Sequence, residues 1–241
     1  ESIHTDVHGN VVVAVNGAGS PRVMLAGHCD QIGFMIQHVG DDGFLSFAGI
    51  GGHDATVLIA QRVHVWTAAG PVNGVIARKA IHLLSSDERA KAPEIHTLWI
   101  DIGASGGDEA RELVAVGDPV TFELCTTELL NDNVASPGMD NKVGVWIVME
   151  AARRVAEMDA QAAVFAVSTV QEEIGTRGAQ TSAFAVRPDV GIAVDVNHST
   201  DVPGVDAKRY GDVKLGGGPV VVRGPNINPR AFEMVVAAAA S

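Results

Sequence analysis

Residues 162–175 read AAVFAVSTVQEEIG, an apolar run that ends in two adjacent glutamates. Residues 162–170 are too continuously apolar for a strand with one solvated face, so they predict a buried parallel strand. Gly175 indicates that the strand has ended by that point. Carboxylates at the end of a buried strand are costly unless a positive charge neutralises them, so Glu172 and Glu173 favour a nearby metal ion. Taken alone, the pair is equally compatible with a solvated loop just past the strand.

The composition of the chain limits what it can bind. Its 241 residues are enough for one large domain or two smaller ones with a real core, and hydrophobic residues make up 46%. The net charge of -12 argues against nucleic acid and anionic membranes as partners. No apolar run reaches about 18 residues, so we expect no membrane span. Cys29 and Cys125 lack CxxC spacing and favour reduced thiols in a cytoplasmic protein.

The pattern along the chain predicts an α/β domain with a β insertion. Between about residues 38 and 124, short β-like segments alternate with glycine-rich turns, which is typical of a small β-barrel or sandwich. After residue 138, strands and helices alternate, which predicts a mostly parallel sheet flanked by helices. The expected elements of the α/β part are strands at 11–15, 22–27, 32–36, 162–170 and 190–194, and helices at 140–155 and 177–184.

These elements predict three segments. Residues 1–36 form the first part of the α/β domain, residues 37–124 form an inserted β-barrel, and residues 125–241 form the second part. The helix at 140–155 is expected to present Val143, Ile147, Ala151 and Val155 on one face. A last helix begins at Asn228-Pro229 without a stop signal, so we expect a chain that lacks both of its termini.

Four places combine a buried strand or a helix start with acidic or histidine side chains at its tip. Ligands of open α/β sheets gather at the carboxyl ends of the strands, so we expect these places to meet at one edge. The candidate side chains are His28 and Asp30, Asp140, the Glu172-Glu173 pair, and Asp195. One histidine with several carboxylates and no cysteine ligand fits a hydrolytic metal site that holds zinc, cobalt or manganese.

Each of these signals has an ordinary structural alternative. His28 fits a satisfied histidine in a tight turn, and Asp140 fits a helix N-cap. Since His28 and Asp30 are two residues apart, they point to one face of an extended chain, where Asp30 is able to hold the second ring nitrogen of His28. The agreement of four places, rather than any one of them, favours the metal site.

Four motifs resemble the M42 family of metallo-aminopeptidases over essentially the whole chain. They are GHCDQIG at 27–33, MDNKVG at 139–144, QEEIGTRGA at 171–179 and AVDV at 193–196. Members of that family carry a β-barrel-like domain between the first two ligand motifs. The resemblance implies a cytoplasmic enzyme that removes N-terminal residues from peptide substrates and self-associates, from a dimer up to a dodecamer, through the β insert.

The resemblance also implies a role for each candidate residue. Asp140 bridges two divalent ions, zinc or cobalt, and His28 and Asp195 complete the first metal site. Glu173 binds the second ion, and Glu172 is the general base that takes a proton from the attacking water. Asp30 is the second catalytic residue that the resemblance implies, and its role is to support His28.

Two departures from the family pattern concern the same site. Gln31 stands where members usually have an acid. The family's last ligand is a histidine beyond residue 241, and His198 does not match its position, so the second metal site is incomplete within this sequence.

Three alternatives stay open at this point. One is another metal hydrolase of the same superfamily, a deacylase or a carboxypeptidase. Another is a glycosidase, since family members have carried an endoglucanase label and paired carboxylates cleave glycosides. Aromatic residues are only 5% of the chain, which disfavours a sugar-binding cleft. The third is a non-catalytic assembly subunit, if the protein ends at Ser241.

Overall fold

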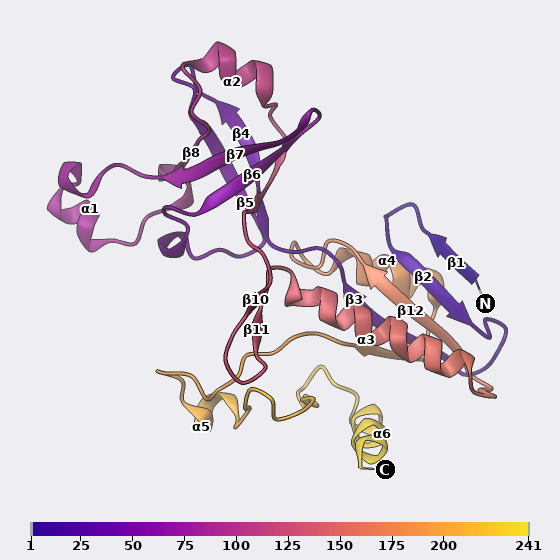
Figure 1. Cartoon of the computed structure of the whole chain (residues 1–241). Coiled ribbons are helices and arrows are strands. Elements are labelled where there is room, and N and C mark those ends of the chain that lie inside the picture. Colours follow the sequence, from indigo (N-terminus) through magenta and orange to yellow (C-terminus); the bar gives the residue numbers. More distant parts are fainter. Residues whose placement is uncertain (1, 241) are drawn as a thin grey trace. The chain divides into compact units, whose positions relative to one another are not determined.

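The computed structural model describes residues 2–240, and its internal contacts divide the chain into two compact units. Unit 1 comprises residues 1–28, 141–168 and 181–241, and unit 2 comprises residues 29–140 and 169–180. Figure 1 shows the helices and strands of both. The division between Asp140 and Asn141 falls inside the first turn of one helix, so Asp140 is carried by a helix that otherwise belongs to unit 1.

Unit 1 is built on a five-stranded sheet with the strand order β1-β2-β12-β3-β13. Its strands are β1 (Ser2–Thr5), β2 (Val11–Val15), β3 (Arg22–His28), β12 (Ala163–Thr169) and β13 (Val190–Ala193). Except for β1, they lie where the sequence predicted strands. Strand β12 is buried along its whole length, as its unbroken apolar run indicated.

The sheet is mixed, so the prediction of a mostly parallel sheet is not confirmed. Strand β13 pairs with β3 in parallel, but β1 with β2 and β2 with β12 pair antiparallel. The β1–β2 pair is a hairpin whose turn is held by Asp6, which accepts hydrogen bonds from the backbone N–H groups of His8, Gly9 and Asn10. Burial on both faces produces the same apolar run for either pairing direction. The sequence of Val11–Val15 therefore does not indicate that this strand pairs antiparallel with β12.

Helices cover both faces of the sheet. Along β12, Ala163, Phe165 and Val167 pack in one core cluster with Val186 of helix α4 (Arg177–Val186). The alternate residues Val164 and Ala166 pack in another cluster with Val148 and Ala152 of helix α3 (Met139–Ala156). Because side chains alternate across a strand, one continuously apolar strand serves two cores. The predicted flanking helices are therefore confirmed.

The buried face of α3 is not the expected one. Val143 and Ile147 are exposed, whereas Asn141, Gly144, Val148 and Ala152 are buried. The reason is a close approach between α3 and β3. A Cβ atom at Gly27 of β3 would lie 2.6 Å from the carbonyl carbon of Gly144, which leaves no room for a branched side chain at this contact.

The core of unit 2 is a closed barrel with the strand order β4-β5-β8-β7-β6-β9, in which neighbouring strands pair antiparallel (Figure 1). The strands are β4 (Gly33–Val39), β5 (Leu45–Ile50), β6 (Arg62–Thr67), β7 (Gly70–Ala77), β8 (Trp99–Asp101) and β9 (Pro119–Phe122). The predicted small β-barrel is confirmed. Its interior is filled by fully buried residues such as Phe34, Leu45 and Ile100.

The barrel begins earlier than the boundary drawn between residues 36 and 37. The strand expected at residues 32–36 was predicted to belong to the α/β domain. In the structure, residues 33–36 are part of strand β4 of the barrel. Phe34 and Ile36 are instead buried in the barrel core. An apolar strand indicates burial but does not tell which of two cores receives it.

The remaining elements are short, apart from the last helix. Unit 2 also contains helices α1 (Ser86–Ala90) and α2 (Gly107–Leu113), the 3-10 turns η1 (Ala55–Val57), η2 (Ile81–Leu83) and η3 (Ile95–Thr97), and a hairpin of β10 (Thr127–Glu128) and β11 (Val134–Ala135). Unit 1 ends with α5 (Ala207–Tyr210) and α6 (Pro229–Ala239), and Asn228 caps α6 as predicted. No helix between residues 2 and 240 has both the length and the apolarity that a bilayer crossing requires.

Candidate metal centre

His28 is the last residue of β3, and its side chain is almost completely buried. The strand ends against the first turn of α3, since Gly27 is the residue that approaches Gly144 so closely. A buried imidazole at the carboxyl end of a strand is well placed to serve as a ligand, because packing fixes the direction of its ring nitrogens.

Asp195 follows β13, the parallel neighbour of β3. The backbone N–H of Val194 donates to the carbonyl of Ala26 at 2.8 Å, which continues the pairing with β3 up to Asp195. The Asp195 Oδ1 atom lies 3.8 Å from Nε2 of His28 and also accepts a hydrogen bond from the backbone N–H of Val196. The parallel pairing therefore brings together two residues that are distant in the sequence.

Asp140 in the first turn of α3 completes a group of three. One ligand atom from each of His28, Asp140 and Asp195 lies within 4.8 Å of the other two. In the described part of the chain, this is the only group of three or more histidine, cysteine, aspartate or glutamate side chains with that spacing. A helix N-terminus stabilises the negative charge of Asp140.

The donor set of this group fits a divalent transition metal. Bonds from zinc to nitrogen and oxygen are about 2.0–2.2 Å long, so two ligands of one ion lie at most about 4.4 Å apart. The 3.8 Å between His28 and Asp195 is within that limit. Asp140 and Asp195 are both exposed, whereas His28 is buried. One imidazole and two carboxylates suit zinc, cobalt or manganese.

Unit 2 contains a second group, formed by Asp30, Glu172 and Glu173. The Asp30 carboxylate accepts one hydrogen bond from the backbone N–H of Glu172 and another from that of Glu173, each at 3.1 Å. All three residues are half-buried. Asp30 therefore fixes the backbone of the glutamate pair by a two-point contact, a connection that the sequence did not predict.

The backbone around the pair is tightly turned. Gln171 and Thr176 both have positive φ angles, 58° and 52°, in the left-handed region that is uncommon for residues other than glycine. The carbonyl of Glu172 accepts hydrogen bonds from the N–H groups of Gly175 and Thr176. Strained backbone of this kind concentrates at functional sites and persists where surrounding contacts hold it.

A loop of the barrel lies against Glu173. Gly51 has a φ of 79°, and a Cβ atom placed on it would lie 3.3 Å from Oε2 of Glu173 and 2.7 Å from Cγ2 of Ile32. His53 holds this loop, since its Nε2 atom lies 2.8 Å from the carbonyl oxygen of Gly33 and 3.2 Å from that of Ile50. The absence of a side chain at Gly51 thus leaves room for the glutamate.

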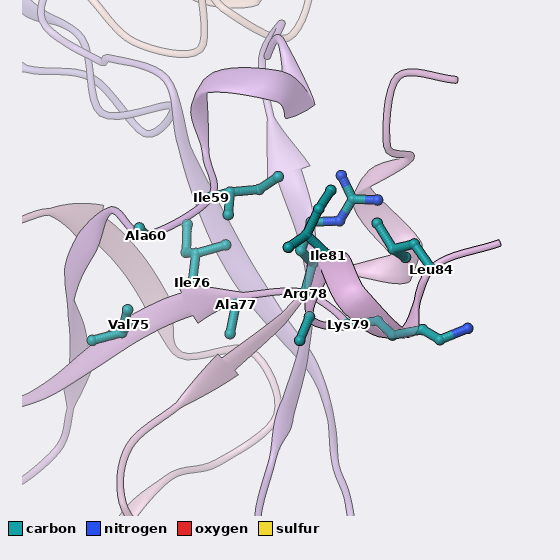
Figure 2. Close-up of a pocket in the computed structure, with 10 residues that line it drawn as sticks. Ile59, Ala60, Val75, Ile76, Ala77, Arg78, Lys79, Ile81 and Leu84 are labelled. Atoms are coloured by element: carbon teal, nitrogen blue, oxygen red, sulfur yellow. The ribbon is translucent and has the colours of Figure 1, made fainter. Parts of the chain in front are cut away.

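The barrel also has a surface pocket of about 490 Å³ that contains none of these residues. Figure 2 shows that it is lined mainly by aliphatic side chains of β7 and the residues that follow, with Arg78 and Lys79 at its side. Lys79 lies 3.3 Å from the carboxylate of Glu88. The pocket has no cluster of polar groups that would support chemistry, in contrast to the His28, Asp140 and Asp195 group.

Asn141 had no predicted role, although it directly follows the candidate ligand Asp140. The structure buries its side chain and bonds it at both ends, to the carbonyl of Val194 and to the N–H of Gly144. The signal in the sequence was an asparagine directly after a candidate ligand, on the helix face that carries Gly144 and Val148.

A mixed α/β sheet with histidine and carboxylate side chains at its strand ends defines a class of metal-binding proteins. Within that class, the chain belongs to the M42 glutamyl aminopeptidase family, whose sequence profile matches residues 9–241. The resemblance that the four motifs carried is therefore confirmed.

Individual relatives agree with this assignment. The chain is 36% identical over 233 residues to the lysyl aminopeptidase of Pyrococcus furiosus, covering 95% of this chain and 65% of that protein. It superimposes with a TM-score of 0.93 on the TET aminopeptidase of a marine sediment Thaumarchaeota archaeon, at 36% identity, with 100% of this chain and 68% of that one covered.

A third relative has a known assembly. The structure of the Pyrococcus horikoshii TET1 peptidase, which assembles into a tetrahedron or a large octahedral shell, matches with a TM-score of 0.84 and 33% identity, covering 98% of this chain and 70% of that one. The chain spans between 56% and 65% of the length of the curated relatives that it matches.

Proposed function

We propose that this chain carries the catalytic metal centre of a metal-dependent aminopeptidase, which hydrolyses the N-terminal residue from peptides. The observation that carries the proposal is the His28, Asp140 and Asp195 group, whose ligand atoms converge at the strand ends of a sheet. Membership of the M42 family and the names of its relatives as aminopeptidases support the reaction class.

In this proposal the chain holds two divalent ions, zinc or cobalt. His28 and Asp195 would hold the first ion, Glu173 would hold the second, and Asp140 would be shared by both. When bound, such ions polarise the scissile carbonyl and lower the pKa of a coordinated water. The barrel loop at Gly51 and the two-point contact from Asp30 support this role, because both restrict where Glu173 lies.

Glu172 is the proposed general base. Glu172 and Glu173 lie in a tight turn rather than an extended segment, so their different tasks rest on the family resemblance and not on strand alternation. Glu172 takes a proton from the attacking water and passes it to the leaving amine, and a positioned base of this kind contributes about 10²–10⁴-fold to the rate. Its half-buried position and its fixed backbone N–H support the assignment.

Two substitutions test this division of labour. Glu172→Gln is expected to keep metal but to lower kcat by about 10²–10⁴-fold, since it removes only the base. Asp140→Ala is expected to lose both metal and activity. Metal analysis after dialysis, together with hydrolysis of leucine-p-nitroanilide, measures both effects.

The same assay separates the alternatives. Carboxymethylcellulose replaces the peptide substrate in a parallel series, and a chelator is added to each. Cleavage of the cellulose substrate would favour the glycosidase, and peptide hydrolysis that survives exhaustive chelation would refute the metal proposal. Metal binding without any hydrolysis would favour the non-catalytic assembly subunit. Equal metal loss in Glu172→Gln and Asp140→Ala would refute the separate roles.

We propose in addition that the protein self-associates through the barrel and acts in the cytoplasm. The assembly of the Pyrococcus horikoshii relative into closed shells supports self-association. Exposed apolar side chains on the barrel, such as Leu83 and Val57, offer a surface for it. The pair of cysteines without a disulfide agrees with a reducing compartment.

A further inference from the structure

The side chain of Asn141 is 1% exposed and uses both ends of its amide. Its Nδ2 atom donates to the carbonyl oxygen of Val194 at 2.7 Å, and its Oδ1 atom accepts from the backbone N–H of Gly144 at 2.9 Å. The residue stands directly after Asp140 in the first turn of α3. A buried amide with both ends satisfied is rigid, because a rotation would break two hydrogen bonds in a dry environment.

The Val194 peptide is held from two directions. Its N–H donates to the carbonyl of Ala26 in strand β3, and its carbonyl accepts from Asn141 of helix α3. Val194 is followed directly by Asp195, and Ala26 is two residues before His28. One backbone unit therefore connects the three segments that carry His28, Asp140 and Asp195.

Close packing strengthens this connection. A Cβ atom at Gly144 would lie 2.2 Å from Oδ1 of Asn141 and 2.6 Å from the Val194 carbonyl oxygen. The helix, the β13 extension and strand β3 therefore meet with no spare volume around the amide. A substitution of Asn141 is therefore expected to shift helix α3 relative to the strand ends, because a close-packed core transmits strain.

We infer that Asn141 is a positioning residue of the metal centre, which sets the separation of the Asp140 and Asp195 carboxylates by tying helix α3 to the Val194 carbonyl. The inference rests on the proposed metal centre. It goes beyond the ligands themselves, since Asn141 contributes no ligand atom. Outer contacts that orient ligands typically change metal affinity by about 10–100-fold when they are removed.

The requirement for asparagine follows from the two hydrogen bonds. A carboxylate in its place can accept from Gly144 but cannot donate to Val194, so an aspartate keeps the shape, loses the tie to the β13 extension and turns an acceptor oxygen toward the Val194 carbonyl oxygen. An additional negative charge beside a cation would by itself strengthen metal binding. A positioning role for Asn141 therefore predicts weaker metal binding in Asn141→Asp, whereas an effect of charge alone predicts tighter binding.

The experiment measures Zn²⁺ and Co²⁺ binding to the metal-free chain by titration calorimetry, for the wild type, Asn141→Asp and Asn141→Ala. We expect both variants to bind each metal about 10–100-fold more weakly. The visible absorption spectrum of the Co²⁺-loaded protein should also change, since it reports ligand geometry and does not respond to stability. Circular dichroism of the metal-free wild type and variants checks that all three proteins are equally folded before metal is added.

The matched control is Asn228→Asp, at an asparagine that caps helix α6 with its Oδ1 atom only. It should leave metal affinity and the Co²⁺ spectrum unchanged. Unchanged or tighter binding in folded Asn141→Asp, with an unchanged spectrum, overturns the inference. A wild-type chain that binds neither metal overturns the proposed metal centre instead, so the two failures are distinguishable.

Discussion

At the scale of single residues, Asp30 is informative because it makes two contacts with one side chain. Its carboxylate accepts from consecutive backbone N–H groups, those of Glu172 and Glu173. Because Asp30 lies two residues after His28 in the sequence, it was predicted to support the His28 ring. The structure connects it to the glutamate pair, which lies about 140 residues away in the sequence, a distance over which spacing has no predictive power.

Asp30→Asn is expected to disturb this contact, since an amide presents an N–H donor to one of the two backbone N–H groups. Hydrogen bonds to a charged group are worth about 1.5–3 kcal/mol, so we expect a loss of that order in the free energy of unfolding. Urea denaturation measures it, and kcat should fall because Glu172 loses its fixed backbone.

The control for this prediction is Asp206→Asn, at an exposed N-cap where asparagine serves equally well. It should unfold like the wild type. If Asp30→Asn also unfolds like the wild type and keeps full activity, then the two-point contact is not important for the glutamate pair.

At the scale of elements, the sequence located strands and helices well but not their partners. Val11–Val15 was predicted as a strand and is one, yet its antiparallel pairing with β12 was missed. Hydrophobic periodicity reports burial, and pairing direction depends on contacts with distant segments. The same limit explains why residues 32–36 were assigned to the wrong core and why the packed face of α3 was displaced to Asn141 and Gly144.

The approach of β3 to α3 can be tested at Gly27. An alanine there would bring its Cβ atom within 2.6 Å of the Gly144 backbone, so we expect a destabilisation of about 1–3 kcal/mol, typical of overpacking. Metal affinity should fall as well, since His28 is the next residue. Urea unfolding and calorimetric titration check both.

The matched control is Gly191→Ala in β13, where no atom lies within 4 Å of the added Cβ. Alanine should stabilise this position slightly, by about 0.5–1 kcal/mol, because glycine loses more conformational freedom on folding. A Gly27→Ala protein as stable as Gly191→Ala would contradict the close approach.

At the scale of the whole molecule, the two units have separate cores. The barrel cluster includes Phe34 and Ile100, and the sheet clusters include Val148 and Val167. The sequence anticipated this division from the change of texture near residue 38. It did not anticipate that residues 169–180, with Glu172 and Glu173, belong by their contacts to the unit of the barrel.

Self-association through the barrel predicts a difference between two equally exposed leucines. Leu83 of η2 in the barrel unit is 68% exposed, and Leu215 of unit 1 is 69% exposed. Leu83→Glu should shift the protein toward smaller species in sedimentation velocity, because a charge is costly in an interface core. Leu215→Glu should sediment like the wild type. A monomeric wild type, or identical profiles for both variants, would contradict the proposal.

The order of the strands along the chain also has a consequence for synthesis on the ribosome. All six barrel strands lie between residues 33 and 122, whereas β2 must wait for β12, which begins at Ala163. At about 5–20 residues per second, the roughly 40 residues between β9 and β12 take about 2–8 s to emerge. The barrel can therefore close while the apolar strands β2 and β3 are still without the partner that covers them, and this interval is when the nascent chain is most exposed to aggregation.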